Sequence, residues 1–262
     1  MCTKPAPKLG DIVEIRTKSG LRYAQFSHYH SIKPNNWGAL LRILPGVFTT
    51  RPGDFNELAS SKELFFTFFP LQAAIKRGVM EVVANESIPA LAQKFPLFRS
   101  GIRNPATGKV EVWWLWDGEK AWKVGQLTDA QLDLPIKQIP SYLMLVERIE
   151  NGWTPRRAED FIDQARASSK ATENGPQASR GPAQARHFLI FNDRTNAENA
   201  AKKIRDLNLE VCVSELGQNW GVSVLQQDLS YDAVTSLTER LRTIATSASG
   251  FYDGTEIGMG GN

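Results

Sequence analysis

The chain has 262 residues, of which 42% are hydrophobic, and this is enough apolar material for two separate cores. It contains no run of about 18 consecutive apolar residues, which excludes a membrane-spanning helix, and residues 1–10 lack the apolar run of a signal peptide. The two cysteines, Cys2 and Cys212, are too few for a disulfide framework. These features predict a cytoplasmic protein.

The composition changes abruptly at residues 165–186. This stretch contains no Leu, Ile, Val, Met, Phe, Tyr or Trp, so it cannot bury enough apolar surface to offset the entropy lost on ordering. The sequence therefore predicts a flexible linker at residues 165–186 that joins two separately folding domains, residues 1–164 and 187–262.

Charge is distributed unevenly along the chain, whose net charge is +3. Residues 1–164 carry 21 Lys and Arg against 17 Asp and Glu, and the linker carries 4 against 1. Residues 187–262 carry 6 against 10, a net charge of −4. This negative domain repels phosphate, which argues against direct binding of nucleic acid. A basic protein segment is the partner that its charge favours.

Short alternating or aromatic runs dominate the N-terminal domain. Residues Gly10–Thr17 alternate with the period of a half-buried strand, and Glu63–Pro70 is typical of a core strand. Leu71–Lys76 is expected to form one helical turn, and Pro155–Gln164 a closing helix with proline in its first turn. The chain is therefore predicted to be α+β, with a mostly-β curved sheet or barrel in this domain. Further strands are expected at Leu21–His30, Trp37–Leu44, Val79–Val83 and Tyr142–Ile149, with Pro-rich loops around Pro89, Pro96 and Pro105.

The clearest hairpin is Lys109–Gly125, where two aromatic-rich runs flank the turn dipeptide Asp117–Gly118. Alternation places Trp114 and Trp116 on one face of the first strand. Either a loop or the closing helix covers these rings, or they form a platform for a protein partner together with Asp117, because tryptophan is enriched at interface hot spots. Nearby carboxylates disfavour a base-stacking surface: Glu111, Asp117 and Glu119.

Recognisable catalytic motifs are absent from the sequence, including the P-loop, HExxH, GxSxG and paired CxxC patterns. His28 and His30 lie two residues apart, so a strand directs both to one side. A zinc site there needs further ligands, for which Asp11 or Glu14 are candidates. We expect surface or network histidines and solvated carboxylates instead, with no catalytic residue, no cofactor and no metal.

A series of short motifs is spread over residues 10–154. They are GDIVEI, YAQ at Tyr23–Gln25, WGALLRILPG at Trp37–Gly46, RPGDF, FFPL, FPLFR, WWLWDG and ERIENGW. In this order they resemble the immunity protein 26 family of bacterial polymorphic-toxin systems. The resemblance implies a β-rich antidote that binds and blocks a toxin effector, such as a nuclease, and it implies no catalytic residues.

The C-terminal domain is predicted to have the element order βαββαβ of a ferredoxin-like sandwich. Thr195 with Glu198 forms a capping box that marks the start of the first helix. The second helix has an apolar stripe at helical spacing. That stripe contains Val234, Leu237, Leu241, Ile244 and Ala248, and the strands are expected at His187–Phe191, Glu210–Leu216, Trp220–Leu225 and Phe251–Glu256.

The motifs NWGVSV at Asn219–Val224 and GFYDGTE at Gly250–Glu256, together with the element order, resemble the regulator of ribonuclease E activity B (RraB) family. This resemblance implies an acidic protein that binds a ribonuclease and lowers its activity without catalysis. The chain departs from the family pattern in lacking a dense Asp/Glu run. Candidate contact residues are Trp220, Tyr252 and Asp253, with core packing or a turn as the alternative, and Cys212 is expected to be inert within an apolar strand.

These observations predict a non-enzymatic protein-binding inhibitor with two domains. The main hypothesis is an immunity or antitoxin-type protein that neutralises a bacterial toxin effector through its N-terminal domain. The alternative is a regulator of RNA metabolism that inhibits a ribonuclease through its C-terminal domain. A third possibility is an unrecognised enzyme with a pocket near His28, His30 and Asp11.

Overall fold

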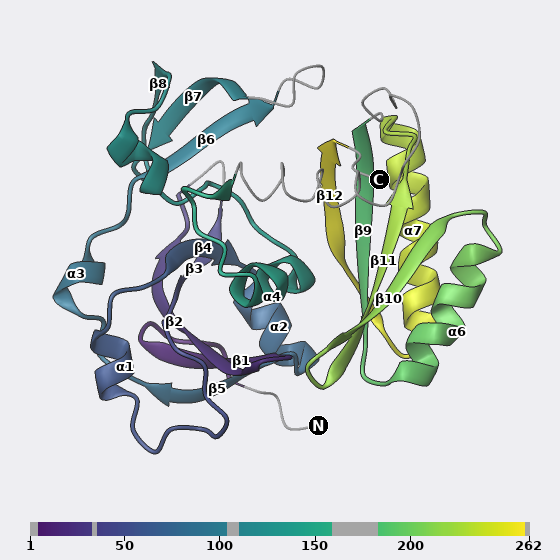
Figure 1. Cartoon of the computed structure of the whole chain (residues 1–262), viewed down its shortest axis with the longest axis horizontal. Helices are drawn as coiled ribbons and strands as arrows, with labels where there is room; N and C mark the ends of the chain where they lie inside the picture. The colour runs from purple at the N-terminus through teal and green to yellow at the C-terminus, as the bar shows by residue number, and fades with distance from the viewer. Residues whose placement is uncertain (1–4, 33–35, 104–109, 159–182, 260–262) are drawn as a thin grey trace, which may run out of the picture. The chain divides into compact units, whose positions relative to one another are not determined.

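A computed structural model describes residues 5–32, 36–103, 110–158 and 183–259 (Figure 1). The chain divides into two compact units, which we describe separately. The N-terminal unit contains residues Met1–Pro140 and Leu145–Arg157, and the C-terminal unit contains residues Ser141–Met144 and Ala158–Asn262. No helix in the described ranges is both long and apolar enough to cross a membrane.

An antiparallel five-stranded sheet forms the centre of the N-terminal unit, with the strand order β4-β3-β2-β1-β5. No pairing of described residues joins the edge strands β4 and β5, so the sheet is open and the predicted barrel does not form. The predicted strands and the helical turn are present with small shifts of their ends. The strands are β1 (Asp11–Thr17), β2 (Gly20–His30), β3 (Gly38–Ile43), β4 (Phe65–Phe69) and β5 (Met80–Asn85), and the short helices are α1 (Asn56–Ser60), α2 (Leu71–Arg77) and α3 (Ala90–Gln93).

The sheet is covered more fully than the alternation in its first strand predicts. In β1 the side chains from Asp11 to Ile15 are all buried, including the carboxylate of Glu14, which is 2% exposed. Ile12 packs with Tyr23, Leu44 and other side chains of one core cluster. Both faces of this strand are therefore interior, and its buried polar groups need hydrogen-bond or charge partners within the protein.

A second antiparallel sheet has the order β6-β7-β8 and contains the predicted hairpin. The hairpin consists of β7 (Val110–Trp116) and β8 (Ala121–Gly125). Gly118 in its turn has φ +104, a backbone conformation that L side chains rarely adopt, and Phe95 packs directly against it. The third strand, β6 (Phe98–Arg103), occupies a region predicted to be Pro-rich loop.

The predicted strand at Tyr142–Ile149 is wrong, because residues Tyr142–Glu150 form the helix α4. The apolar residues of this segment also fit helical spacing, since Tyr142, Leu145, Val146 and Ile149 are all buried. A short apolar run does not distinguish a buried strand from a helix by periodicity alone. The predicted closing helix at Pro155–Gln164 lies mostly outside the described residues.

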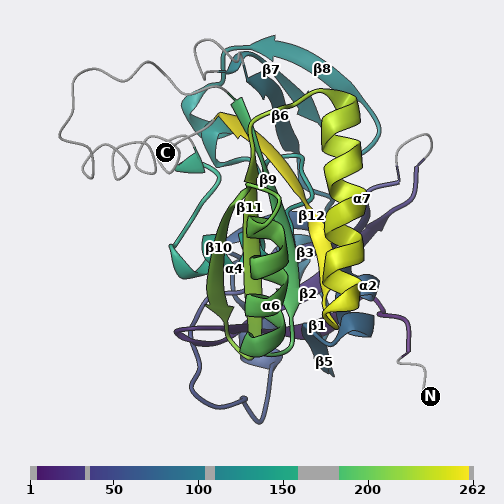
Figure 2. The same ribbon diagram turned by 90° about the vertical axis from the view of Figure 1, so that its right-hand side faces the viewer.

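The C-terminal unit confirms the predicted βαββαβ order and forms an antiparallel sheet with the strand order β10-β11-β9-β12. Both helices lie on the same face of this sheet (Figure 2). Leu189, Phe191 and Val222 of the sheet pack there against Ala200 and Leu241 of the helices. The elements are β9 (Ala183–Phe191), α6 (Arg194–Arg205), β10 (Glu210–Leu216), β11 (Asn219–Gln226), α7 (Tyr231–Ser247) and β12 (Phe251–Met259).

Two boundaries of this unit differ from the predictions. Helix α6 begins at Arg194, and its N-cap is Asp193, which accepts a hydrogen bond from the amide of Asn196, so the predicted Thr195 capping box does not start the helix. Strand β9 begins at Ala183, within the predicted linker. Its first residues lack large apolar side chains, but they pair with β11 and β12 on either side. The other linker residues, 165–182, lie outside the described ranges.

Candidate partner-binding surfaces

The two tryptophans predicted to form a platform differ in exposure. Trp114 is 43% exposed, whereas Trp116 is 5% exposed and belongs to the core. Trp116 pairs with Phe98 and Trp114 with Ser100 without a register shift between them, so both point to the same face of β7. That face is buried at the Phe98 end and open at the Trp114 end. The joint platform is thus reduced to Trp114.

Trp116 is part of an aromatic cluster formed by Trp37, Phe68, Phe95, Phe98 and Trp116. Its ring centroid lies 5.5 Å from that of Phe98 and 5.9 Å from that of Trp37. The Lys137 ammonium lies 4.2 Å from the centroid of Trp116 and 4.9 Å from that of Trp37. Burial lowers the pKa of Lys137, while the two ring faces attract its positive charge. Nothing in the sequence near Lys137 indicates that its ammonium lies against two tryptophan rings.

Asp117 has a local structural role in the hairpin turn. Its carboxylate accepts hydrogen bonds from the main-chain amides of Lys120, at 2.7 Å, and Glu119, at 3.0 Å. These amides, that of Lys120 first, lower the pKa of Asp117. The side chain is therefore engaged in the turn and presents a fixed negative charge beside it.

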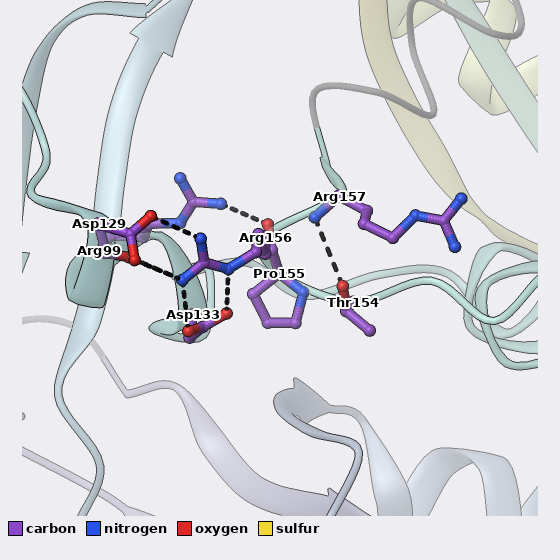
Figure 3. A network of polar contacts seen from close by, with 7 residues as sticks. All are labelled: Arg99, Asp129, Asp133, Thr154, Pro155, Arg156 and Arg157. Atoms are coloured by element: carbon purple, nitrogen blue, oxygen red, sulfur yellow. Dashed lines mark hydrogen bonds and ion pairs between the residues drawn. The ribbon is translucent and has the colours of Figure 1, made fainter.

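A polar network holds the end of the N-terminal unit in place (Figure 3). The guanidinium of Arg156 pairs with Asp129 at 2.8 Å and with Asp133 at 2.7 Å, and it lowers the pKa of both carboxyls. The buried Arg99 donates to the carbonyl oxygen of Pro155 and also lies over the ring of Trp113. These contacts anchor residues 155 and 156 to the 3-10 helix Asp129–Asp133 and to β6.

The histidines and carboxylates considered as metal ligands have separate partners. His28 contacts the carbonyl oxygen of Gln93 at 3.0 Å, and His30 that of Gly118 at 2.8 Å. Asp11 accepts hydrogen bonds from the main-chain amide of Lys8 and from the side chain of Asn85. Within the described ranges, no group of three or more His, Cys, Asp or Glu side chains is placed to hold a metal ion.

Glu14 is paired with cations rather than solvated as the sequence suggested. Its carboxylate lies 2.9 Å from Arg51 and 3.3 Å from Arg16, and it accepts a 3.4 Å hydrogen bond from the hydroxyl of Tyr23. Burial, followed by the nearby Glu14 charge, raises the pKa of Tyr23 to about 12. The neutral phenol therefore remains a donor, and the arginines neutralise the buried carboxylate.

In the C-terminal unit, Trp220 and Tyr252 are half-buried and pack against the helix-covered core. The guanidinium of Arg194 lies 5.2 Å from the Trp220 ring centroid. The hydroxyl of Tyr252 lies 2.8 Å from Nδ1 of His187, which is fully buried. Both aromatic residues thus combine a packing role with partial exposure.

His187 is the centre of a cluster of hydrogen-bonded side chains that the sequence did not indicate. Its Nε2 lies 2.8 Å from the amide oxygen of Gln226, and its Nδ1 lies 3.0 Å from the hydroxyl of Thr255. An amide oxygen only accepts, so Nε2 carries the proton and Nδ1 accepts from the hydroxyls of Thr255 and Tyr252. Burial lowers the pKa of His187, which keeps the imidazole neutral.

Acidification is therefore expected to destabilise the C-terminal unit. The pKa of His187 in the folded state lies below its unfolded value of about 6.5, so stability is fully present above that pH and is lost as the pH falls towards the folded value. One such proton changes the free energy of unfolding by at most about 1.4 kcal/mol per pH unit. Chemical denaturation at several pH values within about one unit on either side of the unfolded-state pKa measures this slope. In His187→Gln the slope is expected to flatten, and an unchanged slope would contradict the assignment.

Asp253 lies in β12 at a β-bulge, not in the predicted turn. Its carboxylate accepts hydrogen bonds from the main-chain amides of Tyr142, at 2.6 Å, and Leu143, at 3.4 Å. These two residues belong to the segment Ser141–Met144, which groups with the C-terminal unit. The side chain therefore satisfies amides at the start of α4, which have no partner within the helix.

Strand β10 forms one edge of the C-terminal sheet. Its side chains Glu210, Cys212 and Glu215 are exposed, so Cys212 is not enclosed by the strand, and its predicted inertness stays a prediction. The Cys212 thiol makes a long contact, of 4.0 Å, with the carbonyl oxygen of Val213. β10 pairs with β11 over its whole length without a register shift. Its outer side is paired with no described strand.

Comparison with known families finds a match over part of the chain. Residues 169–256 match the family model "Regulator of ribonuclease activity B", which assigns an RraB domain to this part of the chain. No curated protein and no solved structure matches the chain. The resemblance of residues 10–154 to immunity protein 26 gains no support from these comparisons.

Proposed function

We propose that this chain is a non-enzymatic regulator that binds a ribonuclease, ribonuclease E foremost, and lowers its activity through the RraB domain. The observation that carries the proposal is the match of residues 169–256 to the RraB family model. The domain's net charge of −4 over residues 187–262 supports it, because a negative surface attracts a basic segment of the enzyme. The N-terminal unit then serves as an attached domain whose partner is not assigned.

The test is an RNA cleavage assay with purified ribonuclease E and increasing amounts of the full chain. The cleavage rate is expected to fall in a saturable manner, and the inhibition is expected to weaken as salt is raised, because solvent-exposed charge pairs are screened over about 8 Å at physiological ionic strength. A cleavage rate that is unchanged at every concentration, with no complex on a sizing column, would show that this enzyme is not the target.

Matched variants separate the two units in the same assay. Trp220→Ala and Asp253→Ala change candidate contact residues of the C-terminal unit, whereas Trp114→Ala changes the exposed ring of the N-terminal unit. We expect weaker inhibition from at least one of the first two variants and unchanged inhibition from the third. The reverse pattern would place the surface that binds ribonuclease E on the N-terminal unit and would contradict inhibition through the RraB domain.

A further inference from the structure

The outer side of β10 presents a regular set of main-chain groups that pair with no described strand. The β10–β11 hairpin has a two-residue loop, Gly217 and Gln218, so the flanking pair Leu216 and Asn219 is hydrogen-bonded. Hydrogen-bonded and non-hydrogen-bonded pairs alternate along an antiparallel ladder. The N–H and C=O groups that point away from β11 are therefore those of Val211, Val213 and Glu215.

These outward groups have no main-chain partner among the described residues, because β10 ends the sheet order and no further main-chain bond involves them. Within Glu210–Leu216 there is no proline, lysine or bulge, which are three of the features that protect an edge strand against strand addition. Figure 2 shows β10 and β12 at the two opposite sides of the sheet, with β9 and β11 between them.

The side chains of this edge select the charge of an added strand. Glu210 and Glu215 are exposed, and no ion pair with a described residue involves either of them. Because they are five positions apart, alternation places them on opposite faces of the sheet. An added strand therefore meets a carboxylate on each of its faces, and cationic residues at the matching positions are favoured.

We propose that the β10 edge is a docking strand for an extended, basic protein segment, which adds to the sheet by main-chain hydrogen bonds to Val211, Val213 and Glu215. This proposal deepens the proposed function, since it names the chemistry of the segment through which a ribonuclease partner is held. Main-chain bonds supply the affinity of such strand addition, and the two carboxylates supply the selectivity. A neutral or acidic segment of the same length leaves Glu210 and Glu215 unpaired or repelled.

The test uses a synthetic nine-residue peptide of β-branched residues, a length and pattern chosen for about one strand, with two lysines spaced to face Glu210 and Glu215. Residue-resolved amide exchange of the full chain is measured with and without it. We expect exchange at Val211, Val213 and Glu215 to slow by about tenfold or more, since exchange then requires release of the added strand. The inward amides of Cys212 and Ser214 serve as internal controls because they are already bonded to β11.

Two changes of charge complete this test. The same peptide with glutamate in place of both lysines is expected to leave the three outward amides unprotected. The double variant Glu210→Lys and Glu215→Lys is expected to reduce the affinity for the basic peptide by about tenfold or more, from the loss and reversal of two exposed charge pairs. Glu239→Lys, an exposed acid on α7, is the matched control and is expected to bind normally. Protection by both peptides alike, or by neither, would overturn the docking strand.

The enzyme itself distinguishes this proposal from the proposed function. If ribonuclease E is inhibited but does not protect the outward amides of β10, the docking strand is wrong and the regulator function stands. If the basic peptide protects these amides but ribonuclease E is neither bound nor inhibited, the docking strand stands and the choice of enzyme is wrong. Protection that grows with protein concentration in the absence of any peptide would indicate a second copy as the occupant and would overturn the basic segment.

Discussion

Replacing Arg42 with alanine is expected to lower the free energy of unfolding of the N-terminal unit by about 3–5 kcal/mol, the usual cost of leaving a buried charge network without one partner. The Arg42 side chain is fully buried. It donates to the Gln25 side chain at 3.0 Å, to the carbonyl oxygen of Ala59 at 2.9 Å, and to that of Ser61. Alanine removes these bonds and leaves a cavity at a fully buried position.

Glu63 adds an electrostatic component to this network. Its carboxylate lies 3.5 Å from Nε of Arg42, yet neither atom makes a well-formed hydrogen bond. At this distance the two charges attract one another, but they gain no stabilisation from a hydrogen bond. Burial lowers the pKa of Arg42 and Glu63 raises it, but a guanidinium remains protonated at any physiological pH.

Urea titration of the full chain, followed by amide exchange in β3, measures the effect of Arg42→Ala. Arg42→Lys is the matched variant, because it keeps the charge and loses the planar fork. Its free energy of unfolding is expected to lie between that of the alanine variant and that of the original protein. If both variants unfold at the same urea concentration as the original protein, the buried guanidinium contributes no net stability and its partners are satisfied in another way.

Trp116→Ala is expected to destabilise the N-terminal unit by about 3–5 kcal/mol, whereas Trp114→Ala is expected to change the free energy of unfolding by no more than about 0.5 kcal/mol. The two residues lie on the same strand and the same face, so the pair isolates the effect of burial. Trp116 loses contacts with Phe68, Phe95, Phe98 and the Lys137 ammonium. Trp114, in contrast, is 43% exposed.

Thermal unfolding of the two variants, resolved by amide exchange in β3 and β9, measures this difference and assigns it to one unit. β9 is the internal control, since it belongs to the C-terminal unit. Equal destabilisation by both substitutions would show that the Trp114 ring is covered in solution. Lys137→Met is expected to be tolerated better than Trp116→Ala, because its stem still covers the aromatic rings.

The sequence predicted the C-terminal fold well because each of its elements has a clear local signal. Strands β10 and β11 alternate around a glycine-containing turn, and α7 carries a helical apolar stripe. Each prediction was therefore made from neighbouring residues. The start of β9 at Ala183 was missed because its pairing with β11 and β12 is long-range and its side chains are small or polar.

The N-terminal unit was predicted less well for two physical reasons. Tyr142–Glu150 is apolar at spacings that suit both a short strand and a helix, and only tertiary packing selects the helix. β6 was hidden among prolines that flank it rather than interrupt it. Open or closed geometry of a sheet depends on whether its edge strands meet, and no local pattern encodes that.

The candidate sites were predicted only where exposure follows from local sequence. Trp114 and Trp116 are equivalent by alternation, yet one is core because Phe68, Phe95 and other distant rings surround it. His187 and Gln226 are ordinary residues of two strands, and only the register Gln226↔Ala185 brings the amide near the imidazole. Such clusters require knowledge of strand pairing, which single-sequence patterns do not supply.

The strand order of the C-terminal unit also has a consequence for the time at which it can fold. β9 is the first strand of this unit along the chain, yet it occupies an interior position between β11 and β12. During synthesis on the ribosome, both sides of β9 remain without a partner until β11 and then β12 have emerged. Unpaired strand edges promote aggregation, so a nascent chain that stops after β10 exposes β9 on both sides. The unit is therefore completed only when its last strand has been released from the exit tunnel.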